Sequence, residues 1–295
     1  MIIDTIKTID FYTKRINQTL IDILSRHDTS ARPAFLRLLE SLRYSLLSSS
    51  AKRLRPILVY ALGEAMHAPL PCLDAPAAAI ELIHTASIVH DDLPALDNDE
   101  LRRGQPASHK AFGEAAAILA GNSMQMLACE VLSDAENSLK PTQQVKCLQV
   151  LMKSSGMNGV MEGQMLDLYE LKSDSTLETL EATYRLKTAS LIKAALLLGA
   201  IAANCHEQYV FDALTKFAEK IGLAYQIQDD ILDVEVDQRS HSKQNSVTYP
   251  SIIGIEKSKA QVKFLYESAL ALLQQLPCDI KLLEAITKRM IFRTY

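Results

Sequence analysis

The stretch FDALTKFAEKIGLAYQIQDDILD, residues 211–233, carries the pattern that decides the fold. Its apolar residues recur every three to four positions, which is the spacing of one face of an α-helix: Phe211, Leu214, Phe217 and Ile221. A second stripe, at residues 35–46, has the same spacing, and the alternating pattern of strands is nearly absent. The sequence therefore predicts an all-α protein of roughly ten to twelve helices. Without a repeat or a flexible linker, we expect a single helical domain over residues 1–295.

The composition indicates a globular protein without a general affinity for polyanions. The chain has 295 residues, of which 48% are hydrophobic, with a net charge of −4 and a pI of about 6.0. This length is enough to bury a large core. The small negative charge favours neither nucleic acid nor an anionic membrane surface as a partner. An anionic ligand would therefore have to be held by a local cluster of cations.

The cysteines and the termini indicate a cytoplasmic protein. The five cysteines include no CxxC pair, so we expect reduced, mostly buried thiols and no zinc site. Charged residues recur too often near Met1 for a signal peptide. The most apolar stretch, residues 194–203, is too short to span a bilayer, so no membrane segment is expected.

Several residues predict where helices end. Pro69 should end one helix, and Pro94 should interrupt a long helix near its C-terminal end. Residues 104–106 contain Gly and Pro and predict a turn. Ser175 followed by Glu178 predicts a capping box with Ser175 as the cap.

Two acidic clusters stand out, each directly after an apolar helical segment. The first has the spacing Asp-Asp-x4-Asp and the second Asp-Asp-x2-Asp: Asp91, Asp92 and Asp97, then Asp229, Asp230 and Asp233. Positions four apart on a helix share a face, and carboxylates held that close repel unless a cation lies between them. Magnesium suits such a site because it accepts one or two carboxylates plus substrate phosphates. Pro94 should distort the first helix enough for Asp97 to turn back toward Asp91. One cluster alone could be solvated acids at a helix end, whereas two in apolar surroundings favour metal binding.

Three basic clusters complement the acids. They are KRLRP at residues 52–56, Arg102 with Arg103, and Lys187 followed by Thr188. Arginine gives bidentate contacts to phosphate oxygens and lysine supplies a compact charge. Each cluster alone is more often surface charge than ligand. Together with the acids, they predict a polyanion held partly through metal and partly by direct cations.

The motifs resemble the short-chain trans-prenyltransferases of the polyprenyl synthetase family, and bacterial farnesyl diphosphate synthases in particular. The matching segments run in family order from about residue 50 to 250: KRLRP (52–56), IELIHT (80–85), HDDLP (90–94), LRRG (101–104), HKAFGE (109–114), GQMLD (163–167), YQIQDDILD (225–233) and TYP (248–250). The resemblance implies the all-helical isoprenoid synthase fold, usually a homodimer. It also implies a reaction that joins isopentenyl diphosphate to an allylic diphosphate.

The resemblance assigns roles to individual residues. Three magnesium ions on the allylic diphosphate would be held by Asp91, Asp92, Asp97, Asp229, Asp230 and Asp233. The same substrate would contact Arg102, Lys187 and Gln226, and isopentenyl diphosphate would be held by Lys52, Arg55, His84 and Arg103. Metals and cations would stabilise the leaving diphosphate, and the dipoles of Thr188 and Gln226 would stabilise the allylic cation.

The sequence departs from the family pattern at several positions. Ser50-Ala51 stand where relatives have Gly-Gly, which makes a close backbone approach to the diphosphate less assured. Asn122 replaces an Asp that usually follows Ala-Gly. The loop after Asp233 is shortened, and Ser246 replaces a Lys, for which Lys243 is a candidate substitute. We expect weaker diphosphate binding or loop closure as a result.

The motifs leave the product length open. Ala86 and Ser87 lie about one turn before Asp91, where a bulkier residue would close the cavity for the growing chain. Both are small, so geranylgeranyl diphosphate is the alternative to the farnesyl product that we expect. Met124 or Met157 on a facing helix are candidates to restore the floor.

Three other functions remain alternatives. His90-Asp91 is compatible with a His-Asp metal phosphohydrolase, which would leave the second acidic cluster unexplained. A terpene cyclase would share the acidic clusters but would not need the cations of residues 52–55. A non-catalytic partner subunit of a heterodimeric prenyltransferase would account for the shortened loop, although both acidic clusters are intact.

Overall fold

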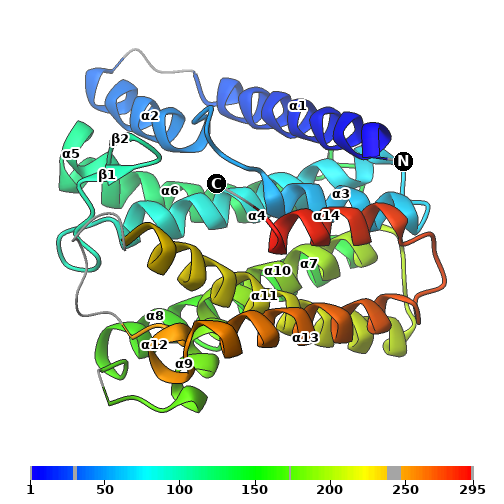
Figure 1. Ribbon diagram of the computed structural model, residues 1–295. Helices are drawn as coiled ribbons and strands as arrows, with labels where there is room; N and C mark the ends of the chain where they lie inside the picture. Colours follow the sequence, from blue (N-terminus) through cyan, green and yellow to red (C-terminus); the bar gives the residue numbers. More distant parts are fainter. Residues whose placement is uncertain (1, 29–31, 173, 238–246, 294–295) are drawn as a thin grey trace.

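The computed structural model describes residues 2–28, 32–172, 174–237 and 247–293, and it confirms the all-α prediction (Figure 1). Within these residues there is one small hairpin, and the remaining elements are helices. The N-terminal half consists of α1 (Ile2–Arg26), α2 (Pro33–Leu46), α3 (Leu54–Ala65), α4 (Leu70–Asp91), β1 (Leu101–Arg102), β2 (Gln105–Pro106), α5 (Ser108–Phe112), α6 (Glu114–Ser133) and α7 (Pro141–Ser155). The remainder consists of α8 (Val160–Tyr169), α9 (Leu177–Tyr184), the π-helix η1 (Arg185–Ala189), α10 (Ser190–Ala202), α11 (Gln208–Asp237), α12 (Tyr249–Ile253), α13 (Ile255–Leu273) and α14 (Lys281–Ile291).

The described residues form 14 α-helices, more than the predicted ten to twelve. Two single glycines account for part of the excess. Gly113 has φ 87° and separates α5 from α6, and Gly254 has φ 85° and separates α12 from α13. A left-handed glycine breaks a helix without any change in the apolar pattern, so these breaks were not visible in the sequence.

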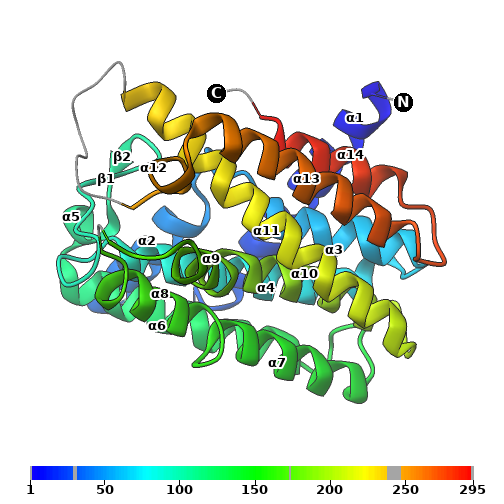
Figure 2. The same ribbon diagram turned by 60° about the horizontal axis from the view of Figure 1, so that its bottom comes forward.

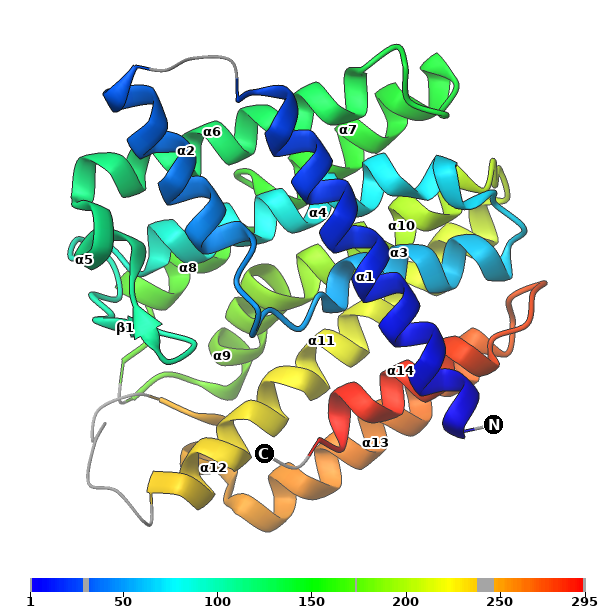
Figure 3. The ribbon, with the colours of Figure 1, turned by 90° about the horizontal axis from the view of Figure 1, so that it is seen from above.

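Helices α4 and α10 form the centre of the bundle. Helix α4 packs against α3, α6 and α10, while α10 also packs against α7 and α11. Helix α1 crosses α3 and α4 on one side of the molecule (Figure 3), and α13 runs along α11 on another (Figure 2). The two Asp-rich segments, at the end of α4 and in α11, therefore both belong to the inner layer of helices.

The turn after α4 follows the sequence prediction, but Pro94 lies beyond the end of the helix that it was expected to interrupt. Pro69 is the residue before α4, and α4 ends at Asp91, three residues before Pro94. The backbone N–H of Asp97 donates to the carbonyl oxygen of Asp91 over 2.8 Å, so the chain turns back as expected. Residues 101–106 form the β1–β2 hairpin, which confirms the predicted turn.

Two local predictions were wrong. Thr176, not Ser175, caps α9: its hydroxyl accepts from the N–H of Thr179, whereas Ser175 bonds to Lys172 and Glu170 before the helix. All five cysteines are free, but only Cys147 and Cys205 are buried, so the thiols are not mostly buried.

Two helices, α4 and α6, are long and apolar enough to cross a membrane by length and composition alone. The expectation of no membrane-spanning segment rests on residues 194–203, and both helices lie outside that stretch. In α4, 72% of the most apolar stretch is buried inside the protein, as in the core helix of a globular protein. In α6 the buried share is 39%, which leaves an apolar face uncovered.

Candidate active site

A cavity of about 520 Å³ lies between α3, α4, α8, η1 and α11. It brings together most of the predicted site residues: Lys52, Arg55, His84, Asp91, Arg102, Arg103, Lys187, Thr188, Gln226 and Asp229. Apolar or small side chains line another part of its wall: Ser87, Ile88, Val160 and Leu191. One cavity thus combines cations, carboxylates and an apolar surface.

Arg55 and His84 form a partly buried polar pair on the cationic side. Arg55 Nη1 lies 3.0 Å from His84 Nε2. Burial, followed by the charge of Arg55, lowers the pKa of His84 well below its usual value, so the imidazole is neutral. Because a guanidinium only donates, His84 Nε2 must accept, and the ring proton resides on Nδ1. Arg55 Nε is buried without a hydrogen-bond partner in the described part of the chain, so the pair retains donors for an anionic ligand.

The other cations of residues 52–55 and 102–103 divide into two groups. Arg53 and Glu81 form a salt bridge of 2.7 Å in which both side chains are 2% exposed, so Arg53 supports the fold. Lys52 and Arg103, in contrast, make no hydrogen bond or ion pair with any residue that the structure describes. Arg53 and Arg103 also have positive φ values, 50° and 54°, a strained conformation that is frequent near functional sites.

The three acids of the first cluster have different environments. Asp91 lines the cavity, and burial raises its pKa to about 6. Asp92 is 2% exposed and accepts from Arg102 Nε over 2.8 Å, while Arg102 also bonds to Asp99. Asp97 is exposed and lies 3.5 Å from Gln164 Nε2. Only the first of the three acids faces the cavity directly.

The second cluster has the same order of environments. Asp229 lines the cavity and pairs with Arg293, whose guanidinium lies 3.9 Å from the centre of the Tyr225 ring. Asp230 is 6% exposed, and its Oδ2 accepts from the Tyr184 hydroxyl over 2.6 Å and from the Tyr249 N–H over 2.7 Å. Asp233 is exposed and lines an adjoining cavity of about 590 Å³.

The π-helix η1 presents Lys187 and Thr188 to the cavity. Lys187 Nζ lies 2.5 Å from Asp167 Oδ2. Burial lowers the pKa of Lys187, but the charges of Asp167, Asp97 and Asp91 outweigh it and raise this pKa above the usual value. Thr188 donates to Gln226 Oε1 over 3.0 Å. Short π-helices often occur at functional sites, where the extra residue redirects side chains.

Several residues that support the site were not predicted from the sequence. In the GQMLD segment, Gly163 packs against the backbone of Lys187, Gln164 reaches Asp97, and Asp167 pairs with Lys187. The helical spacing of residues 163 and 167, with polar residues between apolar ones, was the available signal. Arg293 lies far from the motifs in sequence, and no local pattern pointed to it.

The structure also corrects two expectations about the cavity floor. Ala86 is fully buried in the core, and Ser87 is the residue of this pair that lines the cavity. Met157 is 85% exposed and therefore does not close the floor. Met124 is fully buried on α6. Ser246 and Lys243 lie outside the described residues.

No group of three or more His, Cys, Asp or Glu side chains that could hold a metal ion occurs in the described parts of the chain. This arrangement fits magnesium better than a metal that needs a complete protein cage, because magnesium binds through one or two carboxylates plus phosphate oxygens and water. Asp91 and Asp229, desolvated and facing the cavity, are carboxylates of this kind.

Comparison with known proteins identifies the family. The family model described as polyprenyl synthetase matches residues 37–289. The farnesyl diphosphate synthase of Haemophilus influenzae is 43% identical over 250 residues, covering 82% of this chain and 84% of that protein. A geranylgeranyl diphosphate synthase of Cyanophora paradoxa is 39% identical over 84% of both chains. The crystal structure of a geranyltransferase from Legionella pneumophila superimposes with a TM-score of 0.87 at 37% identity and covers 98% of both chains. The chain belongs to the polyprenyl synthetase family, as the motifs around its two acidic clusters predicted.

Proposed function

We propose that this prenyltransferase condenses isopentenyl diphosphate with an allylic diphosphate, dimethylallyl or geranyl, to make farnesyl diphosphate. The observation that carries the proposal is the composition of the cavity wall. Uncommitted cations and desolvated carboxylates face one space, and an apolar surface extends from it. Two diphosphates and a prenyl chain have these requirements.

The cationic side suits the isopentenyl substrate. Lys52 and Arg103 have no other partner among the described residues, and Arg55 and His84 offer donors at Nε and Nδ1. Lys187 and the Gln226 side chain lie on the side of the carboxylates and suit the allylic diphosphate. The two diphosphates would then bind at separate ends of one cavity, with the double bond of the isopentenyl chain next to the allylic carbon.

Magnesium ions, three by family resemblance, would be held by Asp91 and Asp97 from the first cluster and by Asp229 and Asp233 from the second. Asp92 and Asp230 were also expected as ligands, but both are buried and already hydrogen-bonded to protein groups. We assign Asp92 to holding Arg102, and Asp230 to joining Tyr184 to the start of α12 at Tyr249. When bound, the metal supplies Lewis-acid stabilisation of the leaving diphosphate.

The apolar part of the cavity accepts the growing chain. Ser87, Ile88, Val160 and Leu191 line it. We expect farnesyl diphosphate as the product because the Haemophilus influenzae relative is a farnesyl diphosphate synthase. Geranylgeranyl diphosphate is the alternative because the Cyanophora paradoxa relative is named for it. Ser87 is the residue at which a larger side chain should shorten the product.

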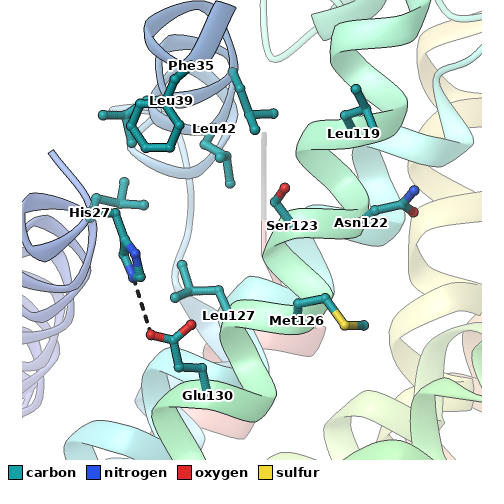
Figure 4. A pocket seen from close by; sticks show the side chains of 12 residues that line it. His27, Phe35, Leu39, Leu42, Leu119, Asn122, Ser123, Met126, Leu127 and Glu130 are labelled. Atoms are coloured by element: carbon teal, nitrogen blue, oxygen red, sulfur yellow. Dashed lines mark ion pairs between the residues drawn. The ribbon is translucent and has the colours of Figure 1, made fainter. Parts of the chain in front are cut away.

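We also propose a homodimer of this chain, a single domain of residues 1–295 that acts in the cytoplasm. Helix α6 leaves Ile118, Leu119 and Met126 between 41% and 65% exposed, an apolar stripe that a second copy would cover. Beside this stripe, a groove of about 320 Å³ separates α6 from α1 and α2; Leu119 and Met126 lie at its edge and His27 faces Glu130 across it (Figure 4). Asn122, one of the departures from the family pattern, lines this groove and not the catalytic cavity.

The alternative functions are less well supported. His90 Nε2 lies 3.3 Å from the Ile118 carbonyl oxygen and the ring packs against Gly121 of α6, which does not suit a His-Asp phosphohydrolase ligand. A non-catalytic partner subunit would not need Asp91 and Asp229 in one cavity with uncommitted cations.

Product analysis of the purified chain alone tests the proposal. The chain should convert geranyl and isopentenyl diphosphates with magnesium into farnesyl diphosphate, and omission of either substrate or addition of a chelator should abolish the product. Activity only after addition of a second, different protein would favour the partner-subunit alternative. Release of inorganic phosphate without a prenyl product would favour a hydrolase.

A further inference from the structure

One buried guanidinium joins three helices beside the catalytic cavity. Arg53 is 3% exposed, and its Nε donates to Asn17 Oδ1 over 2.8 Å. Its Nη1 donates to Glu81 Oε1 over 2.7 Å, and its Nη2 to the carbonyl oxygen of Leu46 over 2.6 Å. Through this single side chain, α1, the last residue of α2 and the middle of α4 are all bound to the segment that precedes α3.

The backbone of Arg53 adopts a conformation that these bonds must hold. Its φ of 50° and ψ of 29° are left-handed, which is unfavourable for a residue that carries a Cβ. Helix α3 begins at the next residue, and the N–H of Ile57 donates to the carbonyl oxygen of Arg53 over 3.1 Å. Because the bonds of the guanidinium compensate the backbone strain, the start of α3 is fixed by the partners of Arg53.

Two side-chain pairs link the start of α3 to α4. Arg53 pairs with Glu81, and both side chains are 2% exposed. Arg55, two residues later, lies 3.0 Å from His84 Nε2 in a partly buried contact. Glu81 and His84 are three positions apart on α4, so they lie about one turn apart on the same face of that helix. The buried pair therefore sets the register, the axial position of α3 along α4, at which Arg55 meets His84.

This register determines the geometry of the cationic side of the cavity. Lys52, Arg55 and His84 line the cavity there. A cation helps to bind a diphosphate only where its N–H donors reach the phosphate oxygens, and a misplacement of about 1 Å can cost about a hundredfold in rate. Arg53 has Nε and both Nη atoms bonded to protein groups, so it acts on this side without contacting the substrate.

We propose that Arg53 is a positioning residue for isopentenyl diphosphate: through Glu81 it holds α3 at the register that places Arg55 against His84 on the cavity wall. The inference rests on the proposed prenyl transfer. It gives Arg53 a role different from those of Lys52 and Arg55 in the same motif, since they contact the substrate and Arg53 sets where they lie.

Two Arg→Lys variants of unchanged net charge test the proposal. Arg53→Lys cannot bind three partners at once, so the KM for isopentenyl diphosphate should rise by about tenfold or more, while the KM for geranyl diphosphate stays within about twofold. Arg15→Lys is the matched control, because Arg15 also joins α1 to α4. Its Nε and Nη2 donate to Asp74 over 2.7 and 2.6 Å, at the end of α4 away from Asp91. Both KM values should stay unchanged in Arg15→Lys.

The ring nitrogens of His84 report the register without any substrate. Because His84 Nε2 accepts from Arg55 in the wild type, the NMR signal of this nitrogen depends on the contact between α3 and α4. The signal should shift in Arg53→Lys and keep its position in Arg15→Lys. Comparison with His84→Gln assigns the signal.

A double variant serves if Arg53→Lys does not fold. Arg53→Met with Glu81→Met removes both buried charges at similar volume, and such replacements are often neutral for stability. The net charge of the site is again unchanged, but the link between α3 and α4 is lost. The double variant should therefore show the same selective rise in the KM for isopentenyl diphosphate and the same shift of the His84 signal.

The proposal is overturned if Arg53→Lys raises the KM values of both substrates equally, or if Arg15→Lys raises the KM for isopentenyl diphosphate as much as Arg53→Lys does. It is also overturned if the His84 signal has the wild-type position in Arg53→Lys and in the double variant. If the wild-type chain transfers no prenyl group, the proposed function fails, while the His84 signal still tests whether Arg53 sets the register.

Discussion

The two acidic clusters have one layout and different surroundings. In each, the first carboxylate lines the cavity, the second is buried, and the third is exposed: Asp91, Asp92 and Asp97 in one, Asp229, Asp230 and Asp233 in the other. Asp92 is neutralised by the guanidinium of Arg102, whereas Asp230 is held by neutral donors from Tyr184 and Tyr249. Spacing along the chain therefore places the acids, but the rest of the fold decides which of them remain available.

The clusters also differ at their first acid. Asp229 pairs with Arg293, a cation that a metal ion would have to displace. Asp91 has no such partner in the described part of the chain, and the nearest influences on it are Lys187 and the other acids of its cluster. The first acid of the second cluster is thus paired with a cation before ligands bind, whereas the first acid of the first cluster has no such pair among the described residues.

The largest effect should come from the first acids of both clusters. Asp91→Asn and Asp229→Asn should each lower kcat/KM by about a thousandfold or more, because each removes a carboxylate from the metal-binding face. Steady-state assays with circular dichroism would measure this, and Asp212→Asn on the exposed side of α11 is the control. Near-normal turnover in either variant would show that the first acids of the two clusters do not have the same role.

The partners of the buried acids should differ in their contribution to stability. Arg102→Gln leaves Asp92 buried without its cation and should lower the free energy of unfolding by about 2–4 kcal/mol. Tyr184→Phe removes one neutral donor while the Tyr249 N–H remains, so this variant should lower the free energy of unfolding by about 1 kcal/mol. Urea denaturation of both variants measures the two losses of unfolding free energy. Equal losses would show that the charge of the hydrogen-bond partner does not affect stability.

The pH dependence of stability should reveal the burial of Asp91, the first acid of the first cluster. Burial raises the pKa of Asp91 from its ordinary value to about 6, so between about pH 4 and 6 the folded state binds a proton that the unfolded state releases. The contribution of Asp91 to the free energy of unfolding is therefore largest at low pH and falls as the pH rises through 6. Asp91→Asn should stabilise the unliganded protein by roughly 1–2 kcal/mol at pH 8 and by almost nothing near pH 4. Thermal unfolding at both pH values measures this, and a difference independent of pH would contradict it.

The smallest effect should come from Arg293. Arg293→Gln removes the cation that competes for Asp229 and should tighten magnesium binding in the presence of diphosphate by about two- to fivefold, since partly exposed ion pairs are weak. Calorimetry would measure the change, with Arg289→Gln in the adjoining cavity as the matched control. Weaker binding in Arg293→Gln would instead mean that Arg293 supports the site.

Periodicity was enough to predict the helical fold, and the acidic and basic clusters together with the family resemblance predicted many of the residues that line the cavity. The turn after Pro94 was predictable because proline geometry is local. Side-chain burial was not, because Lys52 and Arg53 are neighbours in the chain and yet Arg53 is buried against Glu81 while Lys52 is exposed. The pairing of Asp229 with Arg293 and of Asp230 with Tyr249 joins distant parts of the chain, and such contacts leave no trace in local spacing.

We propose that the first carboxylates of the two clusters hold magnesium together on one diphosphate. Calorimetric titration of magnesium into the wild-type chain, with and without inorganic diphosphate, measures this. We expect weak binding without diphosphate, because no three-acid cluster exists among the described residues, and strong binding with it. Asp91→Asn and Asp229→Asn should each remove the strong phase. Strong binding without diphosphate, or a strong phase that survives in either variant, would show that the two carboxylates do not hold magnesium together.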